Sequence, residues 1–265
     1  MSLSDDELTR YARHLVLRQV GGAGQARLKS ARVLMVGAGG LGAPVLLYLA
    51  AAGVGTLGLV DDDTVSLSNL QRQVLYRTAD EGDPKTHAAA QALGALNPHI
   101  SVVPHAVRLT ADNAAQLIGA YDVIADGSDN AATRLLVADT AMALKKPLVS
   151  AAIGQFEGQL ATWRPFDHRD ADGRPTAATP PCLRCLFPQA DDEAGGNCAR
   201  DGVLGAIAGV MGTLQATEVL KEILGIGEGL AGKLMLYDAL SARIRTIAVP
   251  RDPACPHCSG PITSA

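Results

Sequence analysis

RVLMVGAGGLG at residues 32–42, followed by an apolar run and then by LGLVD at residues 57–61, is the stretch that decides the fold of this chain. Residues 32–36 form a short run that is apolar after Arg32 and contains two valines, which predicts a buried strand. Residues 41–52 are rich in alanine and leucine over a length that suits a helix. A second buried strand at residues 56–60 ends on Asp61. The pattern therefore predicts a strand–turn–helix–strand unit.

The turn of this unit contains three glycines, Gly37, Gly39 and Gly42, at GxGxxG spacing. Glycines at these positions let the backbone approach a phosphate group at the N-terminus of the helix. Asp61 follows about 20 residues later, where such units place the acid that holds ribose hydroxyls. The alternative is a glycine turn in an ordinary α/β protein. The strand and helix context favours nucleotide binding, without indicating which nucleotide.

Strands and helices continue to alternate along the chain. We predict strands at residues 101–107, 122–125, 148–152 and 158–163, and helices at residues 86–96, 111–118, 131–144 and 203–224. Repeated units of this length are typical of a Rossmann-like, doubly wound and mostly parallel sheet. Two later segments, 233–237 and 243–249, predict an antiparallel pair of strands. Because no repeat or second core is visible, we expect a single domain over residues 1–265.

The chain opens with a helical extension that precedes the nucleotide unit. Ser4 and Glu7 match a capping box. We expect one helix over residues 5–20, ended by Gly21 and the glycine after it. Arg13 lies on this helix, and from the pattern alone it is a solvated surface arginine.

The composition excludes several classes of protein. The chain is 48% hydrophobic and only 3% aromatic, so aliphatic side chains build its core. A net charge of −4 without a long basic run argues against a nucleic-acid surface. No apolar run reaches membrane-spanning length, and the acidic start lacks a signal-peptide pattern. We expect a soluble, cytoplasmic protein without a nucleic-acid or membrane partner.

Polar residues gather where the predicted strands end. The stretch DGSDN, which contains Asp129 and Asn130, follows the strand 122–125. The loop after the strand 56–60 holds Asp63, Ser68, Asn69, Gln71, Arg72 and Lys85. In a parallel sheet such loops line the ligand crevice, so these side chains can reach a nucleotide. Asp129 suits Mg²⁺ together with substrate phosphates, but Asp129 or Asn130 equally suits an ordinary helix cap.

Four of the five cysteines form two CxxC pairs, Cys182 with Cys185 and Cys255 with Cys258. In a cytosolic chain this pattern indicates metal binding, and it predicts a tetrahedral Cys₄ zinc site with no open coordination position. Two redox pairs or two disulfides are the alternatives. His257 is a further donor, although four sulfurs suffice. The zinc ion would clip the tail to the long, irregular crossover segment 164–201.

These motifs occur together over nearly the whole chain. They are the YARHLVL helix, VGAGGLG, LVDDDTVSLSNLQRQVL, Lys85, DGSDN, CLRC, an isolated Cys198, and CPHC. The combination resembles the MoeB/ThiF family of adenylyltransferases, bacterial relatives of the ubiquitin-activating enzymes, and is most similar to its MoeB branch. The resemblance implies ATP- and Mg²⁺-dependent adenylylation of the C-terminal Gly-Gly carboxylate of a small ubiquitin-fold sulfur carrier, of MoaD or ThiS type, with release of pyrophosphate.

The resemblance also implies roles for individual residues. Asp61 would bind ribose, Gly40 would pack under the nucleotide, and Asp129 would hold Mg²⁺. Because family members are homodimers, Arg13 would reach into the neighbouring subunit's site. The implied catalytic set is Arg13, Asn69, Arg72, Lys85, Asp129 and Cys198. The implied nucleotide-binding set is Gly37, Gly39, Gly40, Gly42, Asp61, Asp63, Ser68, Asn69, Gln71, Arg72, Lys85, Asp129 and Asn130.

Cys198 stands shortly before the predicted helix 203–224. A helix N-terminus favours a thiolate and can make a cysteine nucleophilic. In some relatives a cysteine here bonds covalently to the carrier, in others it is dispensable, and an idle loop cysteine is the alternative. Many relatives carry a C-terminal rhodanese domain that delivers sulfur. This chain ends at Ala265, so we expect no such domain and a separate sulfur donor.

Two other functions compete with carrier adenylylation. An NAD-dependent oxidoreductase with a structural zinc lobe would share the glycine turn and Asp61, but it would not need Arg72, Lys85 and Asp129 around one crevice. A scaffold that binds a partner without catalysis would not need this charged set either. Molybdopterin and thiamine biosynthesis both remain open as the pathway of the carrier.

Overall fold

The fold is known from a computed structural model that describes residues 3–189 and 202–262. One sheet runs through the molecule in the strand order β3-β2-β1-β4-β5-β6-β7-β8. Its parallel part comprises β1 (Arg32–Val36), β2 (Thr56–Val60), β3 (Ser101–His105), β4 (Val123–Asp126) and β5 (Leu148–Ile153). Its antiparallel part adds β6 (Glu157–Trp163), β7 (Lys233–Asp238) and β8 (Arg243–Ala248). The predicted α/β fold with antiparallel C-terminal strands is confirmed.

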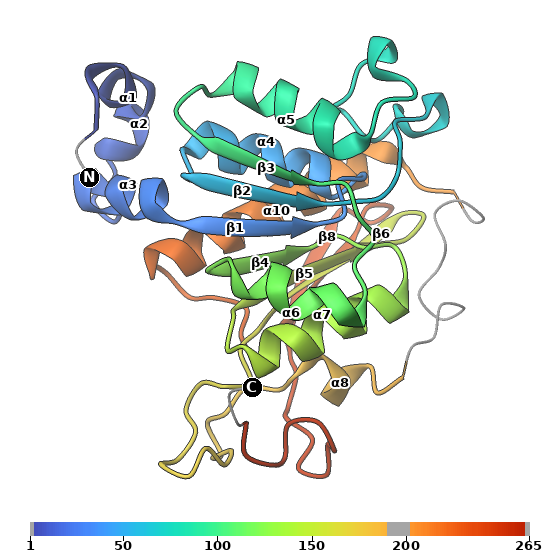
Figure 1. Cartoon of the computed structure of the whole chain (residues 1–265). Coiled ribbons are helices and arrows are strands. Elements are labelled where there is room, and N and C mark those ends of the chain that lie inside the picture. The colour runs from blue at the N-terminus through green and yellow to red at the C-terminus, as the bar shows by residue number, and fades with distance from the viewer. Residues whose placement is uncertain (1–2, 190–201, 263–265) are drawn as a thin grey trace.

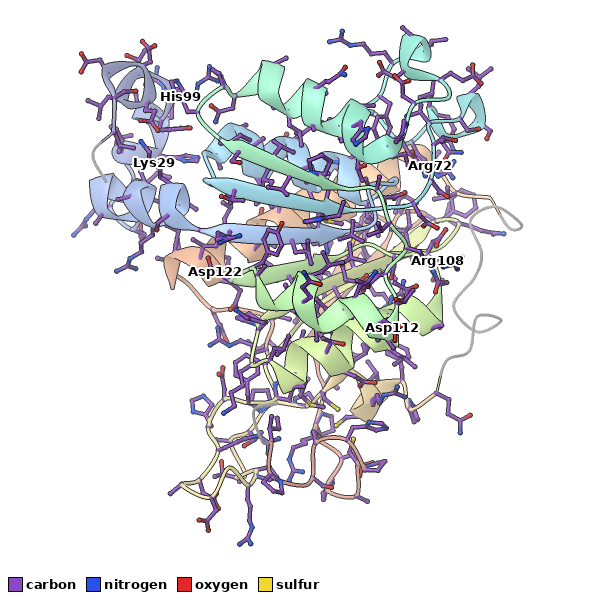
Figure 2. The ribbon with its side chains drawn as sticks, viewed as in Figure 1. Lys29, Arg72, His99, Arg108, Asp112 and Asp122 are labelled. Carbon is purple, nitrogen blue, oxygen red and sulfur yellow. The ribbon has the colours of Figure 1, made fainter. Side chains whose placement is uncertain are left out.

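Helices cover both faces of this sheet (Figure 1). One face carries α4 (Gly42–Ala52), α5 (Lys85–Leu96) and α10 (Gly205–Leu224), and the other carries α6 (Ala111–Gly119) and α7 (Ala131–Ala143). Figure 2 shows Lys29 and Asp122 at the end where the parallel strands begin, and Arg72 and Arg108 at the end where they stop. The two ends of the sheet therefore carry different sets of side chains.

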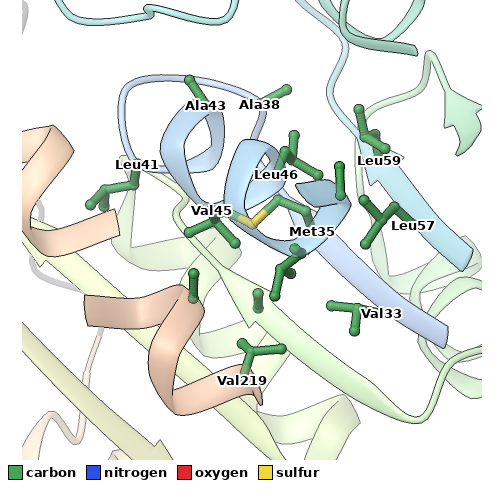
Figure 3. Close-up of a cluster of buried hydrophobic side chains, with 14 of the residues drawn as sticks. Val33, Met35, Ala38, Leu41, Ala43, Val45, Leu46, Leu57, Leu59 and Val219 are labelled. Atoms are coloured by element: carbon green, nitrogen blue, oxygen red, sulfur yellow. The ribbon is translucent and has the colours of Figure 1, made fainter. Parts of the chain in front are cut away.

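Alternate side chains of β1 enter the two halves of the core. Val33 and Met35 pack in the cluster that α4 and α10 cover (Figure 3). Leu34 and Val36 pack in the cluster beneath α6 and α7. Successive side chains of a strand point to opposite faces, so a strand buried on both faces is apolar at nearly every position. This is why RVLMV signals a central parallel strand.

The N-terminal extension differs from the single helix that we predicted. It contains α1 (Asp5–Arg10), α2 (Ala12–Leu15) and α3 (Gly21–Ser30). Ser4 and Glu7 form the predicted capping box. The first helix ends at Tyr11, whose buried ring places its hydroxyl to accept a hydrogen bond from Asn97 Nδ2 at 2.8 Å. Anchoring of Tyr11 breaks the helix, and Gly21, which we expected to end it, begins α3 instead.

Short helices occur in two connecting segments of the chain. The loop after β2 contains η1 (Leu67–Asn69) and η2 (Thr78–Asp80), and the segment after β6 contains α8 (Leu183–Leu186). None of these was predicted, because each is too short to show a period. Within residues 3–189 and 202–262, no helix has the length and apolar character that crossing a membrane requires.

Candidate functional site

A pocket of about 430 Å³ opens at the carboxyl ends of the central parallel strands. The strand order reverses there, because the chain leaves β1 toward α4 on one face and leaves β4 toward α7 on the other. Such a reversal leaves a crevice in which α/β proteins bind ligands. The predicted nucleotide-binding residues that line the pocket are Gly37, Gly39, Gly40, Asp61, Asp63, Asn69, Arg72, Lys85, Asp129 and Asn130.

The glycine turn shapes the floor of this pocket. Gly37 has a φ of 86°, a left-handed conformation that favours glycine. A Cβ on Gly42 would lie 2.1 Å from the carbonyl oxygen of Gly37, so this glycine lets α4 pack against the turn, and it does not itself line the pocket. Gly39 and Gly40 line the pocket where α4 begins. Unpaired N–H groups at a helix start attract an anion, which suits this floor to a phosphate.

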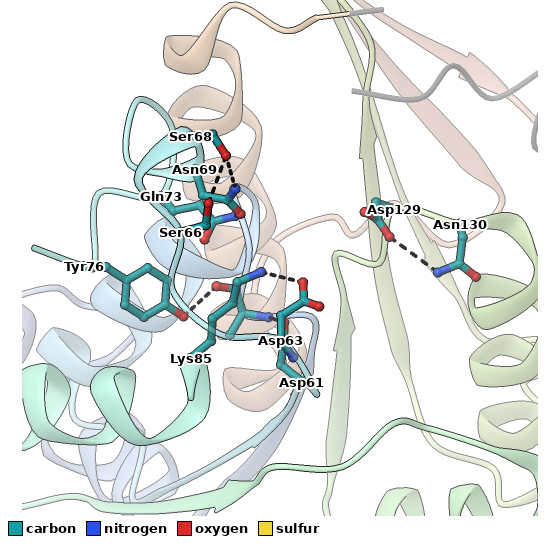
Figure 4. A network of polar contacts seen from close by, with 11 residues as sticks. Asp61, Asp63, Ser66, Ser68, Asn69, Gln73, Tyr76, Lys85, Asp129 and Asn130 are labelled. Carbon is teal, nitrogen blue, oxygen red and sulfur yellow. Dashed lines mark hydrogen bonds and ion pairs between the residues drawn. The ribbon is translucent and has the colours of Figure 1, made fainter. Parts of the chain in front are cut away.

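Asp61 ends β2 at the pocket and braces the glycine turn. Its Oδ2 accepts a hydrogen bond from Ala38 N at 2.8 Å, and its Oδ1 accepts one from Asp63 N at 2.9 Å. Burial raises the pKa of the Asp61 carboxyl, and the nearby Lys85 ammonium partly offsets this effect. The Tyr76 hydroxyl donates to Ala38 O at 2.7 Å (Figure 4). Burial raises the pKa of Tyr76 far above its ordinary value, so its hydroxyl remains a donor.

Asn69 and Arg72 form a second wall of the pocket. Asn69 Oδ1 accepts a hydrogen bond from Gln73 Nε2 at 2.8 Å, and Asn69 Nδ2 donates to Ser68 Oγ at 3.2 Å (Figure 4). Arg72 Nη1 donates to the Ser68 carbonyl at 3.3 Å. Ser68 therefore supports these two residues without lining the pocket, and Gln71 lies beside the start of α10, also outside the lining.

Lys85 is the buried cation of the site. It is the first residue of α5, and its Nζ lies 2.7 Å from Asp63 Oδ2. The Asp63 side chain is 68% exposed, so the pair lies at the open side of the pocket. A buried ammonium requires a charged or hydrogen-bonding partner. A phosphate that enters the pocket can take the place of Asp63 at this ammonium.

Asp129 and Asn130 have separate roles in the loop after β4. Asn130 caps α7, because its side-chain oxygen accepts a hydrogen bond from Thr133 N at 2.8 Å. The cap that we considered for either residue is therefore formed by Asn130. Asp129 is exposed, and its carboxylate accepts from Asn130 Nδ2 at 3.4 Å. Because that contact is long, the carboxylate is available to a ligand in the pocket.

The four predicted metal-binding cysteines form one group. Their Sγ atoms lie 3.8 Å apart for Cys182 and Cys185, 3.7 Å for Cys182 and Cys255, and 3.5 Å for Cys185 and Cys258. These distances exclude disulfide bonds, which join sulfurs at about 2.05 Å. Tetrahedral zinc with Zn–S bonds of about 2.3 Å places its sulfurs about 3.8 Å apart. The group therefore fits zinc, and His257 is exposed outside it.

Thiolates are the form of cysteine that binds zinc. Hydrogen bonds from the thiols of Cys182 and Cys258 lower the pKa of the Cys185 thiol. The same contacts raise the pKa of Cys182 and Cys258, so the crowded sulfurs favour one thiolate, at Cys185, and further thiolates would need the charge of a bound metal ion.

The family model of ThiF matches residues 11–257 of this chain. The chain belongs to the ThiF family. One relative, the sulfur carrier protein adenylyltransferase of Thermus thermophilus, is 51% identical over 97% of this chain and 93% of that protein. The SAMP-activating enzyme E1 of Haloferax volcanii is 45% identical over 97% of this chain and 91% of that protein. MOCS3 of Bos taurus, an adenylyltransferase and sulfurtransferase, is 48% identical, and the match covers 97% of this chain and 54% of that longer protein.

Solved structures share the fold of this ThiF-family chain at low sequence identity. E. coli MccB with MccA-N7isoASN superimposes with a TM-score of 0.80 and 22% identity, covering 97% of this chain and 76% of that one. E. coli MccB with ATP gives a TM-score of 0.76 and 20% identity, covering 98% and 83%. At this identity the likeness establishes the shared architecture alone.

Two arginines of this ThiF-family site were missed in the sequence. Arg108 and Arg134 both line the pocket. Arg108 follows β3, so the strand-end argument would have found it if applied to that loop. Arg134 lies one turn into α7, where no spacing signal separates it from a surface arginine. The pocket is therefore more basic than we predicted.

Arg13 does not reach the pocket of its own chain. It is exposed on α2 and does not line the pocket. Figure 1 shows α1 and α2 beside the starts of the parallel strands. The residues that line the pocket follow the ends of these strands. A role for Arg13 in this ThiF-family site therefore requires a second copy of the chain. Cys198 lies outside the residues that the structure describes.

The cysteine group is joined to the pocket through α8. Cys182 is the N-cap of this helix, and Leu183 and Phe187 line the pocket. Arg184 makes a two-pronged contact with Asp139 of α7, with Nη2–Oδ2 at 2.7 Å and Nε–Oδ1 at 2.9 Å. The cysteines and α7 thus hold α8 as a wall of the ThiF-family pocket.

Proposed function

We propose that this protein uses ATP to adenylylate the C-terminal Gly-Gly carboxylate of a small ubiquitin-fold sulfur carrier protein, with release of pyrophosphate. The observation that carries the proposal is the pocket, where a glycine turn at a helix start lies beside Asp61, the cations Arg72 and Lys85, and the exposed Asp129. The relative named as a sulfur carrier protein adenylyltransferase, 51% identical to this chain, supports the same reaction.

The reaction requires control of negative charge more than it requires a base. A terminal carboxylate is ionised at neutral pH, so it can attack without losing a proton. Its oxygen bonds to the α-phosphorus of ATP while the bond from that phosphorus to the bridging β-phosphate oxygen breaks. Arg72, Lys85 and the N–H groups at the start of α4 would stabilise the triphosphate as charge moves onto pyrophosphate. Asp61 would hold the ribose and so align the α-phosphorus.

The donors of the pocket and of the cysteine group fit two metal ions. Asp129 offers a free carboxylate oxygen beside the phosphate floor, the type of ligand that Mg²⁺ takes together with substrate phosphates. Bound Mg²⁺ would add positive charge at the triphosphate. The four cysteines would hold a structural zinc ion with no open position. We also propose a homodimer in which Arg13 reaches the site of the partner.

Carrier-dependent exchange of pyrophosphate into ATP tests the proposed reaction. We expect exchange with a carrier that ends in Gly-Gly and none with the same carrier shortened by its last glycine. Carriers of the molybdopterin and thiamine pathways, assayed side by side, identify the pathway. No exchange with any carrier that binds the protein would contradict the proposal.

Thermal unfolding separates the proposal from the oxidoreductase alternative. Because the pocket presents cations to a triphosphate, we expect ATP with Mg²⁺ to raise the melting temperature and NAD to leave it unchanged. Stabilisation by NAD alone would favour the oxidoreductase.

Loss of the metal should weaken both the fold and the pocket. In the Cys255→Ser variant we expect no zinc by elemental analysis and a melting temperature lower by about 10 °C, equivalent to a few kcal/mol for a chain of this size. The KM for ATP should also rise, because Leu183 of α8 and Phe187, which directly follows this helix, line the pocket. The matched control is His257→Ala, which should keep the metal. Wild-type protein purified without zinc would contradict this expectation.

Nucleotide binding should weaken on mild acidification. The pKa of Asp61 in the folded protein is raised above the ordinary 3.8 by burial, so this carboxylate takes up a proton at a higher pH than an exposed aspartate does. Protonation removes an acceptor for ribose and relieves the desolvation of the carboxylate. Stability without nucleotide therefore gains from this group as pH falls, whereas the stabilisation by ATP declines. Thermal unfolding from pH 7 to pH 4, with and without ATP, measures both the stability of the free protein and its stabilisation by ATP. In the Asp61→Asn variant, the part of each pH dependence that comes from the Asp61 carboxyl should be absent.

A further inference from the structure

Asp126 is a fully buried carboxylate at the end of β4, directly behind the pocket. It is 0% exposed. Its Oδ1 accepts a hydrogen bond from the backbone N–H of Ser128 at 3.0 Å, and its Oδ2 accepts one from Ser150 Oγ at 2.8 Å. A carboxylate without solvent requires such partners, because an unpaired buried charge is strongly destabilising. The reaction proposed above does not use Asp126, so its burial calls for another explanation.

Arg134 contacts the other backbone polar group of Ser128. Its Nη2 donates to the backbone carbonyl of Ser128 at 2.8 Å, and its Nε lies 3.8 Å from Asp126 Oδ2. The Arg134 side chain is 20% exposed and lines the pocket. Both backbone polar groups of Ser128 are thus held by side chains of opposite charge that face each other.

Ser128 immediately precedes Asp129. Asn130, on the other side of Asp129, is fixed as the cap of α7. The backbone of Asp129 is therefore clamped on both sides, while its own carboxylate stays exposed in the pocket. A metal ligand that is held in place before binding loses less freedom when the ion arrives.

We propose that Arg134 and Asp126 are a positioning pair that holds Ser128 and thereby presents the Asp129 carboxylate to the metal ion. This inference rests on the proposed function, in which Asp129 binds the metal that accompanies ATP. Arg134 acts through the backbone of Ser128, so its contribution is to metal affinity and not to the nucleotide. This positioning role gives a reason for a buried carboxylate, Asp126, three residues before the exposed carboxylate of Asp129.

The test measures metal binding without turnover. Mn²⁺, whose paramagnetism reports its binding, is titrated into the full-length protein saturated with α,β-methylene ATP, an analogue that cannot release pyrophosphate. Arg134→Lys keeps the charge but cannot form the same two-sided contact, and we expect it to weaken Mn²⁺ binding by about tenfold or more. Binding of the analogue in EDTA should change by less than about twofold, because a positioning role does not touch the phosphates.

Four further variants complete the design. Asp126→Asn should weaken Mn²⁺ binding in the same direction, and its combination with Arg134→Lys should add little, because the pair acts as a unit. Ser150→Ala removes a single hydrogen bond, so it remains informative if the charge variants unfold, and its effect should be smaller. Arg164→Lys is the matched control, since Arg164 pairs with Asp167 and Glu222 outside the pocket lining. It should leave Mn²⁺ affinity unchanged.

Each outcome decides the proposal. Unchanged Mn²⁺ affinity in folded Arg134→Lys or, if that variant does not fold, in Ser150→Ala overturns it. A loss of analogue binding in EDTA overturns it as well, because Arg134 would then contact the phosphates directly. Wild-type protein that binds the analogue but no Mn²⁺ would refute the metal role of Asp129, and wild-type protein that does not bind the analogue would refute the proposed function itself.

Discussion

Asp129→Ala should lower carrier-dependent pyrophosphate exchange by about 100- to 1,000-fold, the size of effect seen when one preorganised electrostatic group is removed from an active site. The structure indicates that this loss will come without unfolding. Asn130, not Asp129, caps α7, and the Asp129 carboxylate is exposed with one long contact to Asn130. Removing such a side chain usually changes the free energy of unfolding by less than about 0.5 kcal/mol.

Two control variants make this expectation specific. Asp112→Ala removes an exposed acid of α6 that does not line the pocket, and it should retain both activity and stability. Asn130→Ala removes the cap and should lower stability by about 1 kcal/mol. Near-normal exchange in Asp129→Ala would show that the carboxylate is not needed at the metal.

Arg13→Ala should also abolish exchange, for a reason that involves two subunits. Arg13 lies on α2, a helix that Figure 1 shows beside the starts of the parallel strands, whereas the residues that line the pocket follow the ends of these strands. A symmetric dimer can bring each α2 to the pocket of the partner. An arginine supplied in trans would stabilise charge on the phosphates, as arginine fingers do in other phosphate-transferring enzymes. Loss of such an arginine lowers activity by about 10³-fold or more.

Mixing the two inactive variants tests this arrangement directly. Heterodimers of Arg13→Ala and Asp129→Ala contain one site with both residues intact, one residue from each chain. Random reassembly makes half of the dimers heterodimers, each with one active site of two, so the recovered activity should approach about a quarter of the wild-type value. No recovery after demonstrated subunit exchange would show that Arg13 does not act across the dimer.

Elements whose signal is local could be predicted almost residue by residue. β1 and β2 have the predicted bounds, and α5 begins at Lys85, one residue before the predicted range 86–96. β1 and β2 are buried at nearly every position, so a short continuous apolar run marks each strand along its length. The opening helix was predicted wrongly, because Tyr11 ends it through a contact with Asn97, which lies 86 residues away.

The residues of the candidate site also differ in whether the local sequence reveals them. The GxGxxG turn, Asp61 and the two CxxC pairs were visible because neighbouring residues determine their geometry. Arg134 was not, because its importance rests on the Ser128 carbonyl and the buried Asp126.

By itself, the sequence determined the α/β class, the family resemblance and the residue types available to bind a nucleotide and a metal. The tertiary structure decided which residue does what. It assigned the helix cap to Asn130 and left Asp129 free, and it used Gly42 for packing. It also brought the cysteine group to the pocket wall through α8, and it left Arg13 at the far end of the sheet. Such choices depend on contacts between segments far apart in the chain, which no local pattern encodes.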